Sequence, residues 1–309
     1  AACLCMACGG SDSKDYWGDT SGGGDEEPTE NPNASKPRYI WIDAAANFPD
    51  FANSKENIAR DLALAKDAGF TDIVVDVRPT TGDVLFKTNH VDQVKFMYAW
   101  IGSNYTKVER TATWDYLQAF VDEARKQGLR IHAAINTFVG GNQIDGGTGL
   151  LYRDQSKAAW ATQMNMQTGI TSVMNTSESA KFFNPAHPEV QTFLCNLLED
   201  LASYDLDGIF LDRGRFLNLQ ADFSEESRKQ FEAYMGGIKI QNYPDDILAP
   251  GASSLPATYP KYMTKWLEFR AKVIYDFMQK ARTAVKEVNS KIKFGVYVGG
   301  WYSSYYDVG

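Results

Sequence analysis

Carboxylates at the ends of apolar runs are the residues of this sequence best suited to chemistry. Asp43 follows the run 38–42, Asp76 lies near the end of the run 71–78, and Asp212 ends the run 208–212. A carboxylate can attack a substrate as a nucleophile or exchange a proton with it. We therefore expect Asp212 and Asp76 to be catalytic, with Asp43 as an alternative second carboxylate.

Other polar groups recur on the same faces of such runs. Asp76 and Arg78 share one face of 71–78, and His132 and Asn136 share one face of 129–136, because side chains alternate along a strand. Parallel strands are covered on both faces, so a charged face points into a barrel or its mouth. Aromatic rings near strand ends can stack on sugar rings. The expected substrate-binding side chains are Asp43, Arg78, His132, Asn136, Arg215, Tyr297 and Trp301.

Each of these roles has a structural alternative. Asp76 with Arg78, or Asp212 with a following arginine, could be a buried pair that only shapes the mouth. His132 could equally be a hydrogen-bonded core histidine. For Asp212 a functional role is favoured over a structural one. It is the last residue of its run, and two arginines follow that would keep its carboxylate ionised.

Alternating strands and helices are predicted to position these side chains. The expected strands are 38–43, 71–78, 129–136, 208–212 and 292–298, and the expected helices are 56–68, 113–126, 188–204, 224–235 and 262–289. Strands that alternate with helices pair in parallel through right-handed crossovers. The fold is therefore α/β, either a doubly wound open sheet or a closed barrel.

The absence of nucleotide motifs favours the barrel. No G-x-G-x-x-G follows the first strand, and the glycine-rich stretch 140–149 lacks the Lys-Ser/Thr of a phosphate loop, so we interpret it as a mobile surface loop. A complete (β/α)8 TIM barrel needs about 250 residues, yet residues 38–309 show five strands separated by long loops. We expect a barrel truncated after about five βα units, without strands six to eight, where the second carboxylate could also lie.

The N-terminal segment differs from the rest of the chain. Cys3, Cys5 and Cys8 lie within the first eight residues, and residues 1–8 look like the remnant of a lipoprotein signal peptide with Cys8 as the lipidation site. Residues 9–37 carry a net charge of −5 and are rich in Gly, Ser, Asp, Glu, Pro and Asn. Such a segment has little to bury and is predicted to be a disordered, acidic tether. The folded domain is expected over 38–309.

Composition limits the partners. The net charge is −8 over 309 residues, so no basic stripe exists to bind nucleic acid. No apolar run is long enough to span a membrane, so membrane contact is expected through a lipid anchor only. His90, His132 and His187 are isolated, and no metal-ligand spacing occurs. We therefore expect no metal and no cofactor.

The chain resembles the family 10 glycosyl hydrolase-like lipoproteins. The resemblance rests on FNPAHPEV at 183–190 and YDLDGIFLD at 204–212, with RYIW at 38–41, VRP at 77–79 and WLEFR at 266–270 in support. It covers essentially all of 38–309 and implies a TIM barrel of the cell envelope that hydrolyses sugar polymers. By that resemblance, Asp212 matches the acidic residue that ends the fourth strand. The family often has a second acid next, where this chain has Arg213.

Two functions follow as the main hypotheses. The first is a glycoside hydrolase that acts on a polysaccharide or cell-envelope glycan, lipid-anchored at the outer membrane or periplasmic face of a Gram-negative-type bacterium. The alternative is a non-catalytic glycan-binding envelope lipoprotein on the same barrel. A third is a structural envelope protein whose barrel mediates protein contacts. Glycoside hydrolysis generally needs two carboxyl groups, which separates the first two hypotheses.

Overall fold

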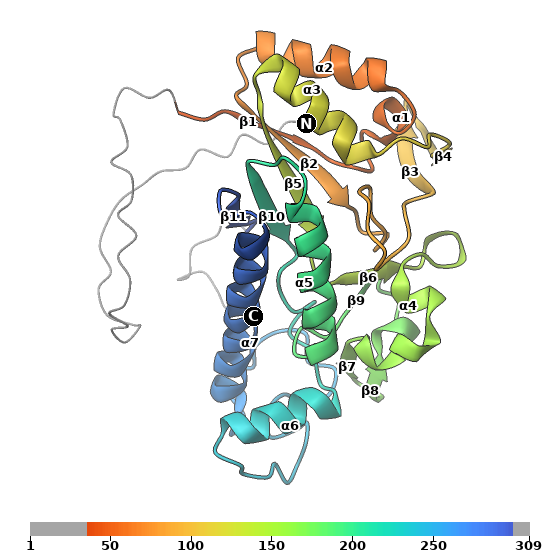
Figure 1. Cartoon of the computed structure of the whole chain (residues 1–309). Helices are drawn as coiled ribbons and strands as arrows, with labels where there is room; N and C mark the ends of the chain where they lie inside the picture. The colour runs from red at the N-terminus through yellow and green to blue at the C-terminus, as the bar shows by residue number, and fades with distance from the viewer. Residues whose placement is uncertain (1–35, 299–309) are drawn as a thin grey trace. The chain divides into compact units, whose positions relative to one another are not determined.

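A five-stranded parallel sheet forms the centre of the protein. The computed structural model describes residues 36–298, and the chain from residue 37 onward forms one structural unit. The strands are β1 (Tyr39–Ile42), β2 (Asp72–Arg78), β5 (Arg130–Asn136), β10 (Gly208–Asp212) and β11 (Lys293–Val296), in that order across the sheet (Figure 1). All four pairings are parallel. The five predicted strands and their parallel pairing are confirmed.

Helices connect these strands and pack outside the sheet. The long ones are α2 (Lys55–Asp67), α3 (Tyr116–Gln127), α5 (Pro188–Ala202), α6 (Glu225–Tyr234) and α7 (Met263–Val288), with short α1 (Phe48–Phe51) and α4 (Leu150–Arg153) between them. Side-chain caps begin three of them: Ser54 Oγ accepts from the Asn57 N–H, Asp115 Oδ1 from the Gln118 N–H, and Ser224 Oγ from the Ser227 N–H. Figure 1 shows α2 beside α3 and α5 beside α7. No helix of residues 36–298 has both the length and the apolar character needed to cross a membrane.

In residues 36–298, three two-stranded antiparallel sheets lie in the long connections after the strands, and none of them was predicted. They are β3 (Phe96–Ile101) with β4 (Asn104–Glu109), β6 (Val139–Asn142) with β9 (Ala180–Phe182), and β7 (Gln163–Met166) with β8 (Gly169–Ser172). Three 3-10 turns accompany them at Ile144–Gly146, Gln155–Trp160 and Val173–Asn175. The β3–β4 hairpin follows β2, whereas the β6–β9 pair and the β7–β8 hairpin between its strands follow β5, so all three lie on connections that leave the carboxyl ends of strands.

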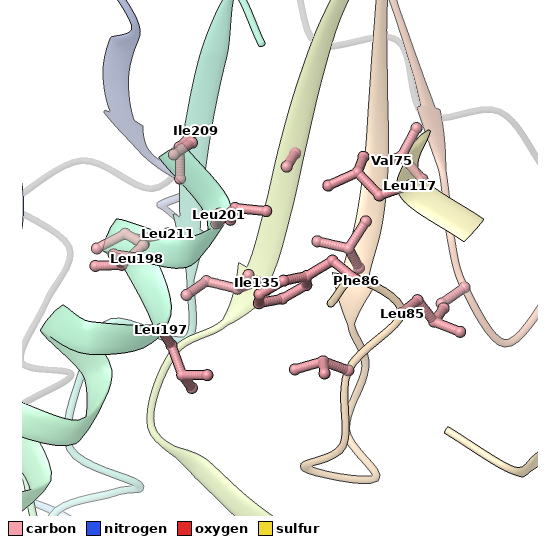
Figure 2. Close-up of a cluster of buried hydrophobic side chains, with 14 of the residues drawn as sticks. Val75, Leu85, Phe86, Leu117, Ile135, Leu197, Leu198, Leu201, Ile209 and Leu211 are labelled. Atoms are coloured by element: carbon pink, nitrogen blue, oxygen red, sulfur yellow. The ribbon is translucent and has the colours of Figure 1, made fainter. Parts of the chain in front are cut away.

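The main core lies between the sheet and its helices. Val75 of β2 and Ile135 of β5 project from the sheet toward Leu117 of α3 and Leu197 of α5 (Figure 2). Phe86, from the connection after β2, lies among them and is 1% exposed. Burial of each such side chain contributes about 1.5–3 kcal/mol to stability. The aliphatic faces predicted from the alternation of β2 and β5 therefore hold the helices.

The two ends of the glycine-rich stretch 140–149 are packed more closely than expected for a surface loop. Gly140 is buried, and a Cβ on it would lie 2.6 Å from Phe183 Cε1. Gly149 has a φ of +83°, and a Cβ there would lie 2.5 Å from the Gly141 Cα. These glycines allow two backbone segments to approach closely, which no other residue permits. This close packing of the two ends was not expected, whereas Gln143, Asp145 and Gly146 in the middle are exposed, and the mobility of the stretch stays a prediction.

Candidate functional site at the mouth of the sheet

A small polar cavity lies where four parallel strands end. Its volume is about 120 Å³, and the residues that line it come from β1, β2, β5, β10 and the turns that follow them. We call it the mouth pocket. The side chains that give it its chemistry are Trp41, Asp43, Asp76, Asn136, Asp212 and Arg213. The structure thus brings together Asp43, Asp76, Asn136 and Asp212, four of the residues selected from the sequence.

Asp76 is the most perturbed group of the pocket. Its side chain is 7% exposed, and its Oδ1 accepts a hydrogen bond from the Arg78 backbone N–H at 3.1 Å. Burial raises its pKa to about 7, and the neighbouring charges of Asp43 and Asp212 add to the increase. A carboxyl group with this pKa can hold a proton at neutral pH and release it during a reaction.

Asn136 connects Asp76 to the other side of the pocket. Its Nδ2 donates to Asp76 Oδ2 at 3.4 Å and to the Arg78 carbonyl oxygen at 3.0 Å. Its Oδ1 accepts from Arg213 Nε at 2.9 Å. With both ends of its amide engaged, Asn136 is held in one orientation. Its main geometric effect is to fix Asp76 and Arg213 relative to each other.

Asp212 and Arg213 form a tight turn at the end of β10. The backbone N–H of Arg213 donates to Asp212 Oδ1 at 2.6 Å, and the Asp212 carbonyl oxygen accepts from the Thr137 N–H at 2.8 Å. Arg213 has a φ of 48°, a left-handed conformation that costs a residue with a Cβ about 1–2 kcal/mol. Such strain persists where the surrounding structure enforces it. Here it directs the N–H back to the carboxylate and the side chain to Asn136.

Asp43 begins the turn between β1 and α1. Its Oδ1 accepts from the Ala46 N–H at 2.7 Å, and its carbonyl oxygen accepts from Asn47 Nδ2 at 2.9 Å. These bonds hold an exposed carboxylate at the rim of the pocket. Trp41, two residues earlier, lies with its ring centroid 6.1 Å from that of Phe210 and 5.5 Å from that of Tyr297.

Arg78 does not face the pocket, so its expected contact with substrate is corrected. It is fully buried, and its guanidinium donates to the carbonyl oxygens of Asn136, Thr137 and Val139. The cause is a register shift between Asp76 and Arg78, which pairs Arg78 with Ile135 on the helix-facing side of β5. Burial lowers its pKa to about 10. Arg78 therefore fixes the backbone after β5.

His132 also lies away from the pocket. Its Nε2 is 2.8 Å from Asp72 Oδ1, and Asp72 is in turn paired with Arg130 at 2.5 Å. His132 shares a face of β5 with Asn136, as expected, but it lies four residues earlier, which is about 13 Å along a strand. The face of the strand was predicted correctly, but the distance of His132 from the carboxyl end of the strand was not considered. The structure thus places His132 in a buried polar cluster at the opposite end of the sheet.

The remaining predicted residues lie around or outside the site. Arg215 does not line the mouth pocket, since its Nη1 donates to the carbonyl oxygens of Phe216 and Leu217 at 3.1 and 2.6 Å. Tyr297 is 55% exposed and reaches the pocket only through its contact with Trp41. Trp301, Cys8 and the tether up to residue 35 lie outside the described residues. Arg213 was not selected, because a left-handed turn after a strand leaves no trace in the sequence.

Parallel strands, covering helices and a carboxylate pocket at the strand ends define a partial (β/α) barrel of the glycoside hydrolase type. The chain belongs to the family described as glycosyl hydrolase-like 10, which it matches over residues 36–308. The resemblance inferred from residues 183–212 is thereby confirmed. Membership supports a glycan-related, hydrolase-like role for the domain.

Two kinds of relatives accompany this match. The chain is 33% identical over 279 residues to an S-layer-related protein from Niallia circulans, covering 86% of this chain but 17% of that protein. Among solved structures it is similar to the PgaB glycoside hydrolase domain from Bordetella bronchiseptica, with a TM-score of 0.55, 14% identity, and coverage of 85% of this chain and 65% of that one. The β-amylase catalytic domain from Paenibacillus polymyxa gives a TM-score of 0.55 at 15% identity, covering 84% and 65%. At these identities the structures show the fold alone.

Proposed function

We propose that this protein is a glycosidase in which Asp76 and Asp212 are the two working carboxyl groups. The proposal is carried by one observation: Asp76 is buried beside two other carboxylates in a pocket at the strand ends, with its pKa raised to about 7. Pairs of carboxyl groups in unlike environments divide the acid and base roles in glycoside hydrolysis. Asp212 is half-buried in the same pocket, and its Oδ1 accepts a hydrogen bond from the Arg213 backbone N–H.

The two groups would act in sequence on one bond. The protonated Asp76 donates its proton to the glycosidic oxygen as the bond to the anomeric carbon breaks. In one route the Asp212 carboxylate attacks the anomeric carbon, and the resulting glycosyl ester is hydrolysed by a water that gives its proton to Asp76. In the other route Asp212 removes a proton from a water that attacks this carbon directly. Asn136 keeps Asp76 and Arg213 in place during the reaction. Asp43 and Trp41 at the rim contact the sugar.

The substrate is proposed to be a polysaccharide or a glycan of the cell envelope. The likeness to an S-layer-related protein supports an envelope location. We further propose that Cys8 carries a lipid and that residues 9–37 tether the domain to the membrane of a Gram-negative-type bacterium. Mass spectrometry of the protein expressed in a Gram-negative host tests this, and an unmodified Cys8 with an uncleaved N-terminus contradicts it.

Asp212→Asn and Asp76→Asn test the catalytic roles. Each amide is nearly isosteric with the carboxyl group but can neither attack carbon nor exchange protons, so turnover should fall by about 10²-fold or more. The matched control is Asp276→Asn, which removes an exposed carboxylate paired with Lys272 on α7, outside the pocket. Turnover is measured on a panel of envelope and plant polysaccharides, with a thermal melt of each variant.

The outcome separates catalysis from binding. If Asp212→Asn lowers turnover while the melting temperature changes little, Asp212 acts on substrate. If the substitution lowers the melting temperature and leaves the specific activity of the folded fraction unchanged, Asp212 is structural. Wild-type binding of a glycan with no turnover on any substrate would favour the alternative of a non-catalytic glycan-binding protein.

A further inference from the structure

The hairpin formed by β3 and β4 presents a row of aromatic rings to solvent. Trp100 is 68% exposed and Tyr105 is 54% exposed, and Phe96 and Tyr98 continue the row. We call these four residues the aromatic platform. Large apolar side chains grouped on a surface mark contact sites more often than single exposed ones do.

The register of the hairpin explains why these rings share one face. Trp100 pairs with Tyr105, and Tyr98 pairs with Lys107, so these side chains point to the same side. Met97 and Ala99 point to the other side and are 4% and 3% exposed. The hairpin thus packs against the protein mainly by the face of Met97 and Ala99. On the opposite face, Trp100 and Tyr105 are exposed to solvent.

The rings of the platform hold one another in place. The centroids of Trp100 and Tyr105 are 5.3 Å apart, and those of Tyr98 and Tyr105 are 5.4 Å apart with 30° between their planes. Phe96 lies 6.2 Å from Tyr98. Rings packed at these distances lose little freedom when they bind a ligand, which lowers the entropic cost of association.

Polar groups border the platform at one end. Lys107 Nζ lies 4.1 Å from the centroid of Phe96 and is paired with Asp145 Oδ2 at 2.6 Å. Tyr98 Oη lies 3.5 Å from Asp145 Oδ1. Asp145 belongs to the turn after β6, so this contact ties the hairpin to a second connection. Carboxylate and phenol oxygens beside flat rings suit a ligand that has both C–H faces and hydroxyl groups.

The platform is connected to the mouth pocket through two segments of the chain. The hairpin interrupts the connection that starts with the pocket residues Pro79 and Thr80. Its strand β3 contacts α1, which follows the turn begun by Asp43 (Figure 1). Two connections that build the pocket therefore also support the platform.

We propose that the aromatic platform is a second saccharide-binding site, which holds pyranose rings of a neutral polysaccharide outside the mouth pocket. The choice of a saccharide as the occupant rests on the proposed function. At about 120 Å³ the pocket is smaller than the 300–1,000 Å³ of common ligand sites. It can enclose the reacting bond but little more of a polymer. Neutral sugars fit because Lys107 is already neutralised by Asp145.

The test uses binding rather than turnover. Trp100→Ala, Tyr105→Ala and the double variant are compared in the Asp212→Asn background, so that no probe is consumed. The probes are microcrystalline cellulose and chitin in pull-down assays, and soluble xylan and laminarin in affinity electrophoresis. Tyr275→Ala is the matched control, because Tyr275 is 61% exposed on α7. Trp100→Phe keeps a ring and should restore part of the affinity.

We expect the double variant to bind at least one probe about tenfold more weakly than the parent, with an unchanged melting temperature. Tyr275→Ala should bind as the parent does. The proposal is overturned if the parent binds no probe, if the double variant binds every probe equally well, or if Tyr275→Ala is equally impaired. It is also overturned if the double substitution only converts a dimer to a monomer on size exclusion. Loss of turnover in Asp76→Asn is measured separately, so failure of the catalytic proposal is distinguishable.

Discussion

Asp76→Asn should change how the stability of the protein depends on pH. The pKa of Asp76 rises from an ordinary 3.8 to about 7 in the folded protein, because its carboxyl group is buried and lies near Asp43 and Asp212. The folded state therefore holds the proton more tightly than the unfolded state does. Its contribution to stability is fully present below pH 3.8 and is lost as the pH rises to about 7. At 1.36 kcal/mol per pH unit, the total loss is about 4 kcal/mol.

An asparagine at this position carries no proton that titrates. The stability of the variant relative to wild type should therefore increase by about 2.5 kcal/mol between about pH 5 and pH 8, as the wild-type carboxyl group ionises. The Arg78 N–H can still donate to an amide oxygen at position 76. Any change in packing or hydrogen bonding adds an offset that does not depend on pH.

Urea unfolding of both proteins at several pH values between about 5 and 8 measures this difference, with the slope m checked for constancy. Asp43→Asn is a second variant with a related expectation. It removes a negative charge near Asp76, so the pKa of Asp76 should fall and the wild-type loss of stability should shrink. A difference between Asp76→Asn and wild type that stays constant across this range would refute the reasoning, since Asp76 would then be ionised throughout and unfit to serve as the acid.

Three further substitutions test features of the fold and the site. Arg78→Met should lower the free energy of unfolding, measured in urea, by about 3–5 kcal/mol, because three buried carbonyl oxygens lose their donor. A loss below about 1 kcal/mol would contradict the role given to this guanidinium. Gly149→Ala should lower it by at least about 1 kcal/mol, since its φ is +83° and the Gly141 Cα lies in the way; unchanged stability would argue against the close approach of these segments. Arg213→Gly should leave the melting temperature nearly unchanged, because relief of about 1 kcal/mol of strain offsets the lost bond to Asn136. Its turnover should fall about tenfold, and full activity would show that the guanidinium has no part in the site.

Much of the frame could be predicted from the sequence because it depends on local patterns. Apolar runs with β-branched residues predicted the strands β1, β2, β5, β10 and β11. Amphipathic segments predicted the helices between them. The same logic placed Asp43, Asp76, Asn136 and Asp212 at one edge, since the ends of parallel strands meet there. These inferences need only the period of a strand and the direction of its neighbours.

The errors arose where a side chain's position depends on tertiary contacts. A single register shift after Asp76 turned Arg78 to the helix side, and alternation alone cannot reveal such a shift. His132 lies on the predicted face of β5 but too far from the carboxyl end of the strand to reach the pocket, and it contacts Asp72 instead. Gly140 and Gly149 lie where segments pack closely, which composition alone does not reveal. The hairpin 96–109 was overlooked because its aromatic residues occur inside a connection, where no strand was sought.

The connections of this barrel are long at the carboxyl ends of the strands and short at their amino ends. Those that leave the carboxyl ends of β2 and β5 span residues 79–115 and 137–187, whereas those that return to β2 and β5 span 68–71 and 128–129. The ion pairs of Asp72 with Arg130 and of Arg125 with Asp205 and Asp207 lie with the short turns. Insertions can therefore accumulate at the carboxyl ends of the strands, while the short turns at the amino ends maintain the arrangement of the sheet. The β3–β4 hairpin could therefore be replaced without redesigning the sheet, which would change the saccharide preference proposed for the aromatic platform.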